Sequence, residues 1–300
     1  HCSSDSKSID SVMIPKLKMA IVDGTAPHVV DPKNPGAVDE IINLGDFWNE
    51  EALRENKEAI LNDNNEVGRT FKRAYRYIKA AYSIYEDNED ILSNCCIKKA
   101  KVNKVTENLV KSTFDDKKSL SYEGKDRCLF ASAITPKGLV NYLHTLIDTG
   151  QVYIIKGMPG TGTQTVLQKL KDTALLRGFD TESFYCALNP LKIEHLIIPQ
   201  LDISFTTSNV YHNVESDGSV QIDFDNYLDA AQMEKYRDIL ELNRNNFELL
   251  LNQAVDTIAK AKKIHDRIEN YYIPNMDFTA LQKCYEDILK RVFKYVRTGI

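Results

Sequence analysis

The sequence predicts an α/β protein with a mainly parallel sheet, and three features of its 300 residues support this class. Short apolar runs of strand length alternate with longer stretches in which apolar residues recur every three or four positions. A glycine-rich loop joins one such run to a helical stretch. The order of elements also repeats along the chain, and strands that alternate with helices favour parallel pairing through helical crossovers.

The first half begins with an apolar run, residues 19–23, that ends in an acid and predicts a buried strand. Residues 31–36 form a proline-rich loop, and residues 49–92 have helical spacing. The apolar and aromatic residues at intervals of three and four there are Phe71, Tyr75, Ile78, Tyr82 and Tyr85. We expect them to line a helix-packing face, with stacking on a ligand as the alternative. A second helix over 97–113 predicts an antiparallel helical hairpin.

The second half opens after a charged, turn-rich stretch, residues 115–126, which marks the expected module boundary. We therefore predict two modules, residues 1–122 and 123–300. The second should contain a strand, a loop and a helix within 128–143, a strand over 152–156, a helix over 164–177 ended by Gly178, and long helices over 228–271 and 278–296. These long helices mirror the first half, so each module carries an appended long helical hairpin.

The chain repeats part of its own sequence, which is the signature of a duplicated architecture. Residues 1–30 align without a gap to residues 185–214, at an offset of 184 positions. The matched pairs include Cys2 with Cys186, Ile9 with Ile193, Ile14 with Ile198, Pro15 with Pro199, Leu17 with Leu201 and His28 with His212. Residues 74–84 also match 254–264, at an offset of 180. Gene duplication explains both matches.

The repeat also predicts which elements the first module lacks. In the second module the repeated segment follows a strand, the glycine-rich loop and a helix, and the counterpart of Gly157 would lie before residue 1. We therefore expect the chain to be the later part of a longer two-module protein, without the first strand, loop and helix of its first module.

The loop reads KGMPGTGTQT from Lys156 to Thr165 and has the position of a Walker A loop in a P-loop NTPase, after an apolar strand and before a helix. Gly157 and Gly162 meet the spacing GxxxxG. Such a loop turns its backbone N–H groups around a phosphate, and the helix dipole adds to the attraction. The predicted nucleotide-binding residues are Gly157, Met158, Pro159, Gly160, Thr161, Gly162, Thr163, Gln164 and Thr165.

The loop departs from the usual motif where catalysis depends on it. Thr163 replaces the lysine that reaches the β and γ phosphates, and Gln164 replaces the hydroxyl residue that holds Mg²⁺. Thr165 lies one position later, turned by about 100° around the helix. We expect weak or absent hydrolysis by this loop. The alternative is that its glycines now form only a tight turn between strand and helix.

A P-loop site usually takes an aspartate from the end of a neighbouring strand to orient Mg²⁺. In the first module Asp23 follows the apolar run and is the candidate catalytic residue and Mg²⁺ ligand, whereas the aligned residue of the second module is Thr207. Asp23 is alternatively a turn aspartate that binds the Gly24–Thr25 backbone. His28 and His212 lie shortly beyond the two strands, with a structural or a catalytic role left open.

Composition excludes some classes of protein and partner. The formal net charge is −5, so we expect no nucleic-acid partner, and no apolar run approaches the roughly 20 residues of a membrane span. A cytoplasmic location is the default expectation. The six cysteines are scattered and include no CxxC pair that would indicate a zinc site; we expect reduced thiols, with Cys95 and Cys96 partly buried, and assign them no chemistry.

The chain resembles an uncharacterised family of bacterial tandem P-loop proteins in the segments IPKLKMAIVDGTAPHVVDPKNPGAVDEIINLGDFW, CLFASAITPKGLVNYL and YIIKGMPGTG. Its members are described as ATP-binding proteins or ATPases, and occasionally as nucleotide kinases. The resemblance covers essentially the whole chain and implies two P-loop NTPase-like modules, each with GxPGTGK followed by Ser or Thr. Thr163 and Gln164 depart from that pattern.

Three functions are compatible with these features. The first is nucleotide binding, with ATP and Mg²⁺ as ligands and hydrolysis in the intact parent protein resting mainly on the first module. The second is a non-catalytic scaffold that binds a protein partner through the helical hairpins. The third, a nucleotide kinase, would need an arginine-rich acceptor site, for which the first module offers Arg54, Arg69, Arg73 and Arg76; a solvated helix face explains these residues equally well.

Overall fold

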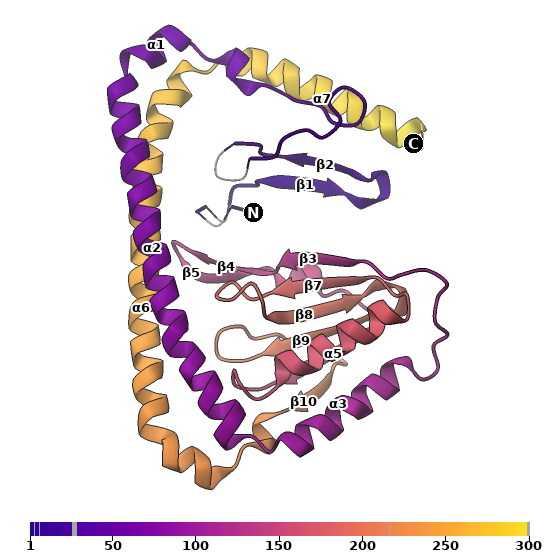
Figure 1. Ribbon diagram of the computed structural model, residues 1–300. Coiled ribbons are helices and arrows are strands. Elements are labelled where there is room, and N and C mark those ends of the chain that lie inside the picture. The colour runs from indigo at the N-terminus through magenta and orange to yellow at the C-terminus, as the bar shows by residue number, and fades with distance from the viewer. Residues whose placement is uncertain (3, 6, 26–28, 216, 299–300) are drawn as a thin grey trace. The chain divides into compact units, whose positions relative to one another are not determined.

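The computed structural model describes all residues except 3, 6, 26–28, 216, 299 and 300 (Figure 1). The contacts divide the chain into two compact units. We call residues 73–256 the loop unit, because they contain the glycine-rich loop, and residues 1–72 with 257–300 the terminal unit. None of the helices within the described residues is long and apolar enough to cross a membrane.

A six-stranded sheet forms the core of the loop unit (Figure 1). All neighbouring strands pair in parallel except β8, which is antiparallel to both β9 and β7. The predicted α/β class with a mostly parallel sheet is thereby confirmed. In spatial order the strands are β10 (Val220–Asp223), β6 (Gln151–Lys156), β9 (Ile203–Ser208), β8 (Ile193–Ile198), β7 (Thr181–Tyr185) and β3 (Asp126–Phe130).

Helix α5 (Thr163–Leu176) covers one face of this sheet. Its fully buried residues recur at helical spacing on one side and pack against apolar residues of β6, β8 and β9; they are Val166, Leu167, Leu170 and Ala174. The helix ends as predicted, with Gly178 at φ 86° and the Phe179 N–H donating to the Ala174 carbonyl at 2.9 Å.

The segment between β3 and β6 differs from the prediction. A strand, a loop and a helix were expected over 128–143, whereas the structure has a second strand and a hairpin partner, β4 (Ser132–Thr135) and β5 (Gly138–Asn141), before the short helix α4 (Leu143–Leu146). Gly138 has φ 94°, and the Thr135 hydroxyl donates to its carbonyl at 2.9 Å. This tight turn reverses the chain where a helix was expected to begin.

The repeated segment has the same structure in both modules. In the second, β8 leads through the 3-10 turn η4 (Pro199–Leu201) into β9; in the first, β1 (Ser11–Ile14) leads through η1 (Pro15–Leu17) into β2 (Met19–Val22). The strand registers match, because His195 lies opposite Thr206 and Ser11 lies opposite Val22. Lys18 at φ 50° and Asp202 at φ 54° close the two turns in the same left-handed conformation.

The surroundings of the two copies differ. Strand β9 lies between β6 and β8, and five of its six residues are buried. Among the described residues β1 and β2 pair only with each other, and three of the four β2 residues are exposed. The prediction of a buried strand over 19–23 is therefore correct for the strand and wrong for its burial, which depends on neighbours that the local sequence does not specify.

Two long helices, α2 (Lys57–Ile91) and α6 (Ala230–Tyr272), dominate the helical part of the fold. The single helix expected over 49–92 is interrupted at Asn56, which separates α1 (Glu50–Glu55) from α2. Each long helix is followed by a turn and a shorter helix. These are η3 (Leu92–Cys96) and α3 (Lys99–Phe114) after α2, and η6 (Ile273–Asn275) and α7 (Phe278–Thr298) after α6.

The predicted helical hairpins are wrong in their partners. Helix α2 lies against α6 rather than α3: the Asn88 side chain donates to the Leu240 carbonyl at 3.1 Å in the loop unit, and Arg267 pairs with Asp63 at 2.8 Å in the terminal unit. Helix α3 packs instead on α5, and its buried apolar residues join the core of the sheet.

Backbone hydrogen bonds connect the end of α2 to the start of α6 in the loop unit. The Asp229 N–H donates to the Cys96 carbonyl at 2.8 Å, and the Lys98 N–H donates to the Tyr227 carbonyl at 3.0 Å. These bonds satisfy polar backbone groups at the two helix ends, where helical hydrogen bonding stops. They attach α3, which belongs to the first module in sequence, to the sheet of the second.

The terminal unit contains the counterpart of this junction. The Asn49 N–H donates to the Asn275 carbonyl at 2.8 Å, and the Asp277 N–H donates to the Phe47 carbonyl at 2.9 Å. Helix α7 of the second module thereby belongs with the strands of the first. The division into modules 1–122 and 123–300 stays a prediction, and each compact unit contains the last helix of the other module, α3 in the loop unit and α7 in the terminal unit.

Replacing Leu170 with alanine should lower the free energy of unfolding by about 2–5 kcal/mol, because a fully buried side chain would leave a cavity under α5. Leu176→Ala on the same helix is the matched control, since Leu176 is 89% exposed and should change the stability by less than about 0.5 kcal/mol. Urea unfolding followed by circular dichroism measures both. Equal losses would contradict the packing of α5 on the sheet.

Candidate functional site

The glycine-rich loop joins the carboxyl end of β6 to α5, as the sequence predicts. Residues 157–162 form the loop, and residues 163–165 form the first turn of the helix. Gly160 at φ 91° and Gly162 at φ 101° adopt left-handed conformations, which side chains other than glycine disfavour. All nine predicted binding residues therefore lie together on one strand–loop–helix unit.

The amino end of α5 has backbone donors that the helix cannot satisfy. Gly162 is the N-cap residue, and no side chain within the described residues caps the helix. The N–H groups of Thr163, Gln164 and Thr165 belong to the first turn, where a helix provides no carbonyl acceptors. Together with the positive end of the helix dipole, they form an environment that favours an anion.

Three other donors of the loop are already in use, and the first of them, the Gly157 N–H, donates to the Ser208 carbonyl at 3.3 Å. The Met158 N–H donates to an Asp225 carboxylate oxygen at 2.8 Å, and the Thr161 N–H donates to the Met158 carbonyl at 3.1 Å. Thr161 is fully buried, and its hydroxyl donates to the same carbonyl at 2.7 Å. Asp225 follows strand β10, the neighbour of β6. The sequence repeat gives no indication of this acid, because β10 lies beyond the aligned segment, residues 185–214.

The loop also packs closely against the helices that precede it in the chain. A Cβ atom on Gly160 would lie 2.5 Å from the Glu89 carbonyl oxygen near the end of α2, and one on Gly162 would lie 3.0 Å from Val102 of α3. Glycine is therefore required at Gly160 both for its backbone conformation and for the approach of another backbone.

The position expected for the partner acid lies directly beside the loop. Thr207 of β9 pairs in register with Ile155 of β6, two residues before the loop. Thr207 is buried, and its hydroxyl lies 2.8 Å from Nε2 of His212. A hydroxyl–imidazole pair therefore occupies the strand end where a P-loop NTPase carries its aspartate.

Asp23 belongs to the terminal unit and has the geometry of a turn aspartate. Its carboxylate accepts hydrogen bonds from the Thr25 N–H at 2.9 Å and from the Thr25 hydroxyl at 2.8 Å. This is the alternative that the sequence left open. A catalytic or Mg²⁺-binding role of Asp23 stays a prediction, and His28 lies outside the described residues.

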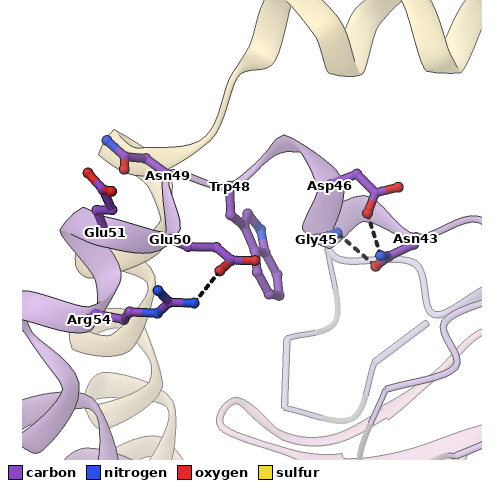
Figure 2. A pocket seen from close by; sticks show the side chains of 8 residues that line it. All are labelled: Asn43, Gly45, Asp46, Trp48, Asn49, Glu50, Glu51 and Arg54. Atoms are coloured by element: carbon purple, nitrogen blue, oxygen red, sulfur yellow. Dashed lines mark hydrogen bonds and ion pairs between the residues drawn. The ribbon is translucent and has the colours of Figure 1, made fainter.

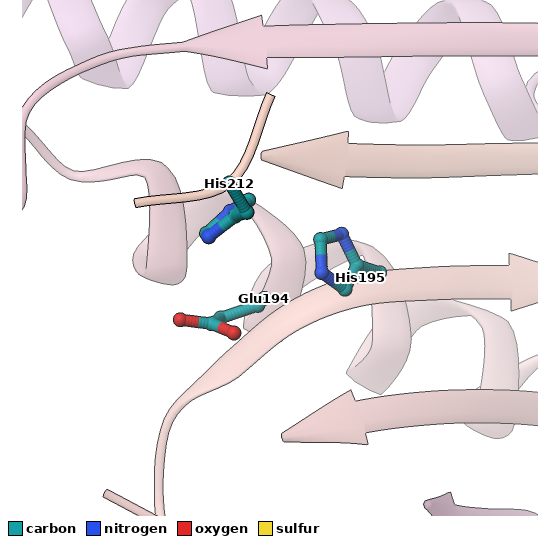
Figure 3. A group of neighbouring side chains, drawn as sticks. All are labelled: Glu194, His195 and His212. Carbon is teal, nitrogen blue, oxygen red and sulfur yellow. The ribbon is translucent and has the colours of Figure 1, made fainter. Parts of the chain in front are cut away.

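A group of side chains of the types that bind metal ions lies near the carboxyl end of β9 (Figure 3). It consists of Glu194, His195 and His212, none of which the sequence identified as a ligand set. Burial and the neighbouring His212 ring lower the pKa of His195 well below its usual value, and burial also lowers the pKa of His212. Both imidazoles are therefore neutral at pH 7, which is the form that binds metal ions.

A buried ion pair lies under the other edge of the sheet. Lys171 of α5 contacts Asp126 of β3, which also accepts hydrogen bonds from the hydroxyls of Thr181 at 2.8 Å and Ser183 at 2.6 Å. Burial raises the pKa of Asp126, but the hydrogen bonds from Lys171, Ser183 and Thr181 outweigh it and lower the pKa overall. Since every partner is satisfied, we assign this group to stability.

The terminal unit has a pocket of about 580 Å³ at the start of α1 (Figure 2). Its polar groups bind one another: Arg54 pairs with Glu50 at 2.6 Å, and the Gly45 N–H donates to Asn43 at 3.1 Å. Arg54, a candidate for a kinase acceptor site, is thus paired within its own helix and largely exposed. The pocket is lined by Asn43, Gly45, Asp46, Trp48, Asn49, Glu50, Glu51 and Arg54.

Gly160→Ala should destabilise the protein more than Gly138→Ala. Both glycines have φ above 90°, so both variants carry the left-handed backbone cost of about 1–2 kcal/mol. Only at Gly160 does the new Cβ meet another backbone, whereas nothing lies within 4 Å at Gly138. We expect an additional loss of about 1–3 kcal/mol in urea unfolding; equal losses would refute the close approach of Glu89.

Asp126→Asn should lower the free energy of unfolding at pH 7 by about 3–5 kcal/mol, because it leaves Lys171 buried without its charged partner. The folded-state pKa of Asp126 is depressed, so its contribution is complete above the unfolded pKa of about 3.9 and is lost as the pH falls through the folded pKa. The difference between the two proteins should therefore shrink in acid. Glu182→Gln, which breaks the more exposed pair with Arg127, should cost less than about 1 kcal/mol.

No family model, curated protein or solved structure matches this chain. A functional proposal therefore depends on the geometry of its own residues.

Proposed function

We propose that the loop unit binds the phosphate groups of a nucleotide, ATP with Mg²⁺, and hydrolyses it weakly or not at all. One observation carries this proposal: the first turn of α5 has no side-chain cap among the described residues and follows two left-handed glycines at the carboxyl end of β6. The strand and the two glycines lead into the N–H groups of Thr163, Gln164 and Thr165, which have no helical acceptors and for which a phosphate is the natural acceptor.

The residues around these N–H groups argue against efficient hydrolysis. Thr163 has no ammonium group to neutralise charge on the β and γ phosphates, and Gln164 cannot replace a hydroxyl ligand of Mg²⁺. Thr207 takes the place of the partner acid. A site that lacks all three groups retains the ability to bind a phosphate through backbone N–H groups but loses the means to stabilise the charge that develops during transfer.

The repeat supports a wider version of the proposal, in which both modules descend from one P-loop ancestor. The matched hairpins β1–β2 and β8–β9 share register and turn conformation. On this proposal the chain belongs to the tandem P-loop proteins that it resembles, and Asp23 serves a loop of the first module.

A non-catalytic scaffold is the second candidate, and the packing of Gly160 favours it. The Glu89 backbone approaches the loop so closely that the glycine is explained without any ligand. On this reading the glycines join the end of α2 to the sheet, and a protein partner binds the long helices. The two candidates differ in whether a nucleotide changes the stability of the protein.

Isothermal titration with ATP and Mg²⁺ tests the first candidate. We expect weak binding by the unaltered chain and at least tenfold tighter binding by the double variant Thr163→Lys with Gln164→Ser, because it restores the ammonium and the hydroxyl. Gln168→Lys adds the same charge one turn further along α5, at an exposed position, and should not tighten binding. Absence of binding by both the unaltered chain and the double variant would reject nucleotide binding and leave the scaffold.

Asp225→Asn should also strengthen ATP binding several-fold. The Asp225 carboxylate accepts a hydrogen bond from the Met158 N–H at 2.8 Å, and its negative charge repels an incoming phosphate. The side-chain oxygen of an asparagine accepts the same hydrogen bond without this charge. Asp223→Asn removes a charge from the same segment and is the control, since its carboxylate accepts from the Asp225 N–H rather than from the loop. A greater effect of Asp223→Asn would contradict this placement of Asp225.

A further inference from the structure

Three potential metal ligands converge near the carboxyl end of β9. One ligand atom from each of Glu194, His195 and His212 lies within 4.8 Å of the others, and the three side chains are neighbours in Figure 3. The two histidines are buried, with exposed fractions of 2% and 8%. The nucleotide proposal assigns no role to this group.

A β-bulge explains how two consecutive residues of one strand reach the same space. Neighbours along a regular strand point to opposite faces of a sheet. The pairing of β8 with β7 shifts here, because Phe184 lies opposite His195 while Tyr185 lies opposite Ile193. Glu194 is the extra residue of the bulge, and such bulges redirect side chains next to functional sites.

The strand β9 orients both imidazoles. Nδ1 of His195 lies 2.6 Å from the Thr206 hydroxyl, and that hydroxyl donates to the Thr207 carbonyl at 3.3 Å. Since the hydroxyl proton is used, Thr206 accepts from Nδ1–H, and Nε2 of His195 keeps its lone pair. Nε2 of His212 lies 2.8 Å from the Thr207 hydroxyl, and in the tautomer in which Nε2–H donates to that hydroxyl, Nδ1 has the lone pair that can bind a metal ion. Metal-binding histidines are held in this way by a hydrogen bond at the other nitrogen.

Cys186 offers a fourth donor beside Glu194, although its sulfur is not among the three ligand atoms that lie within 4.8 Å of one another. Its buried thiol is hydrogen-bonded to Glu194, and the Leu188 N–H donates to its sulfur at 3.4 Å. Burial and the Glu194 carboxylate raise the pKa of Cys186 to about 12, so the thiol is protonated in the absence of a metal. A bound divalent ion displaces such a proton.

We propose that Cys186, Glu194, His195 and His212 form a zinc site. Nitrogen, sulfur and carboxylate ligands in a set of four are typical of tetrahedral Zn²⁺. Ligands about 2.1 Å from a tetrahedral ion lie about 3.4 Å apart, so the three ligand atoms, now within 4.8 Å of one another, move closer together when the ion binds. One thiolate and one carboxylate neutralise the two charges of the ion, which suits a buried position.

The space beside the donors fits this assignment. A cavity of about 30 Å³ is lined by Cys186, Glu194 and His212, together with Tyr85 and Tyr211. This volume corresponds to about one water molecule. The site can therefore accept an ion with limited rearrangement, and a larger ligand is excluded.

The internal repeat provides support that is independent of the geometry. At the offset of 184 positions, Cys186, Glu194 and His212 correspond to Cys2, Asp10 and His28, so a thiol, a carboxylate and an imidazole recur in the first module. The fourth donor does not recur, because His195 corresponds to Ser11. At each of the three matched positions the two modules carry the same type of donor group. This indicates a ligand set that predates the duplication.

Titration with Co²⁺, a spectroscopic substitute for zinc, tests the proposal on the full chain under reducing conditions. We expect tetrahedral d–d absorption and a thiolate-to-cobalt band, both abolished by excess Zn²⁺. Cys186→Ser should remove the band and one equivalent of tightly bound metal. Cys128→Ser, which changes a cysteine outside the cluster, should retain both.

A second variant separates metal binding from folding. His212→Ala should weaken metal binding at least tenfold, and His212→Cys, which offers another zinc ligand, should restore most of the affinity; circular dichroism verifies that each variant is folded. Absence of metal uptake by the unaltered chain overturns the proposal. Unchanged uptake and absorption in both Cys186→Ser and His212→Ala overturn it equally, because the metal would then bind elsewhere.

Discussion

The backbone pairing between the end of α2 and the start of α6 is the constraint on which the loop unit depends. The hydrogen bonds from Asp229 to Cys96 and from Lys98 to Tyr227 fix helix ends that are far apart in the sequence. They place α3 over α5 and bring Glu89 and Val102 against the glycine-rich loop. Since the terminal unit repeats the junction, exchange of the last helix is a property of the duplicated fold rather than of one site.

This junction gives the loop glycines two functions at once. The absence of a side chain at Gly160 lets the Glu89 backbone approach, and the same absence leaves the N–H groups at the start of α5 accessible to an anion. Asp225 accepts the hydrogen bond of one loop donor, the Met158 N–H, so this part of the loop is stabilised from within the chain. If the loop binds a phosphate as proposed, that phosphate competes with an internal carboxylate and binds without the lysine that would favour it.

The end of β9 connects the two proposed sites. Thr207 pairs with β6 at the strand end where a P-loop NTPase carries its partner acid. Its hydroxyl is hydrogen-bonded to His212, one of the proposed zinc ligands. On the two proposals, the residue that stands in place of a magnesium ligand at the nucleotide site also orients a histidine of the zinc site. Both sites lie at the carboxyl edge of the parallel strands, where α/β sheets place their ligands.

Local patterns in the sequence determined the α/β class, the glycine-rich loop between β6 and α5, the end of α5 at Gly178 and the repeat of the two hairpins. These features follow from apolar periodicity, glycine conformation and residue identity, all of which act over a few residues. Tertiary structure alone decided the pairing of α2 with α6, the exposure of β2, the approach of Asp225 to Met158 and the convergence of Glu194, His195 and His212. Each of these depends on contacts between distant segments or on a β-bulge that breaks the strand alternation, and neither leaves a periodic signal in the chain.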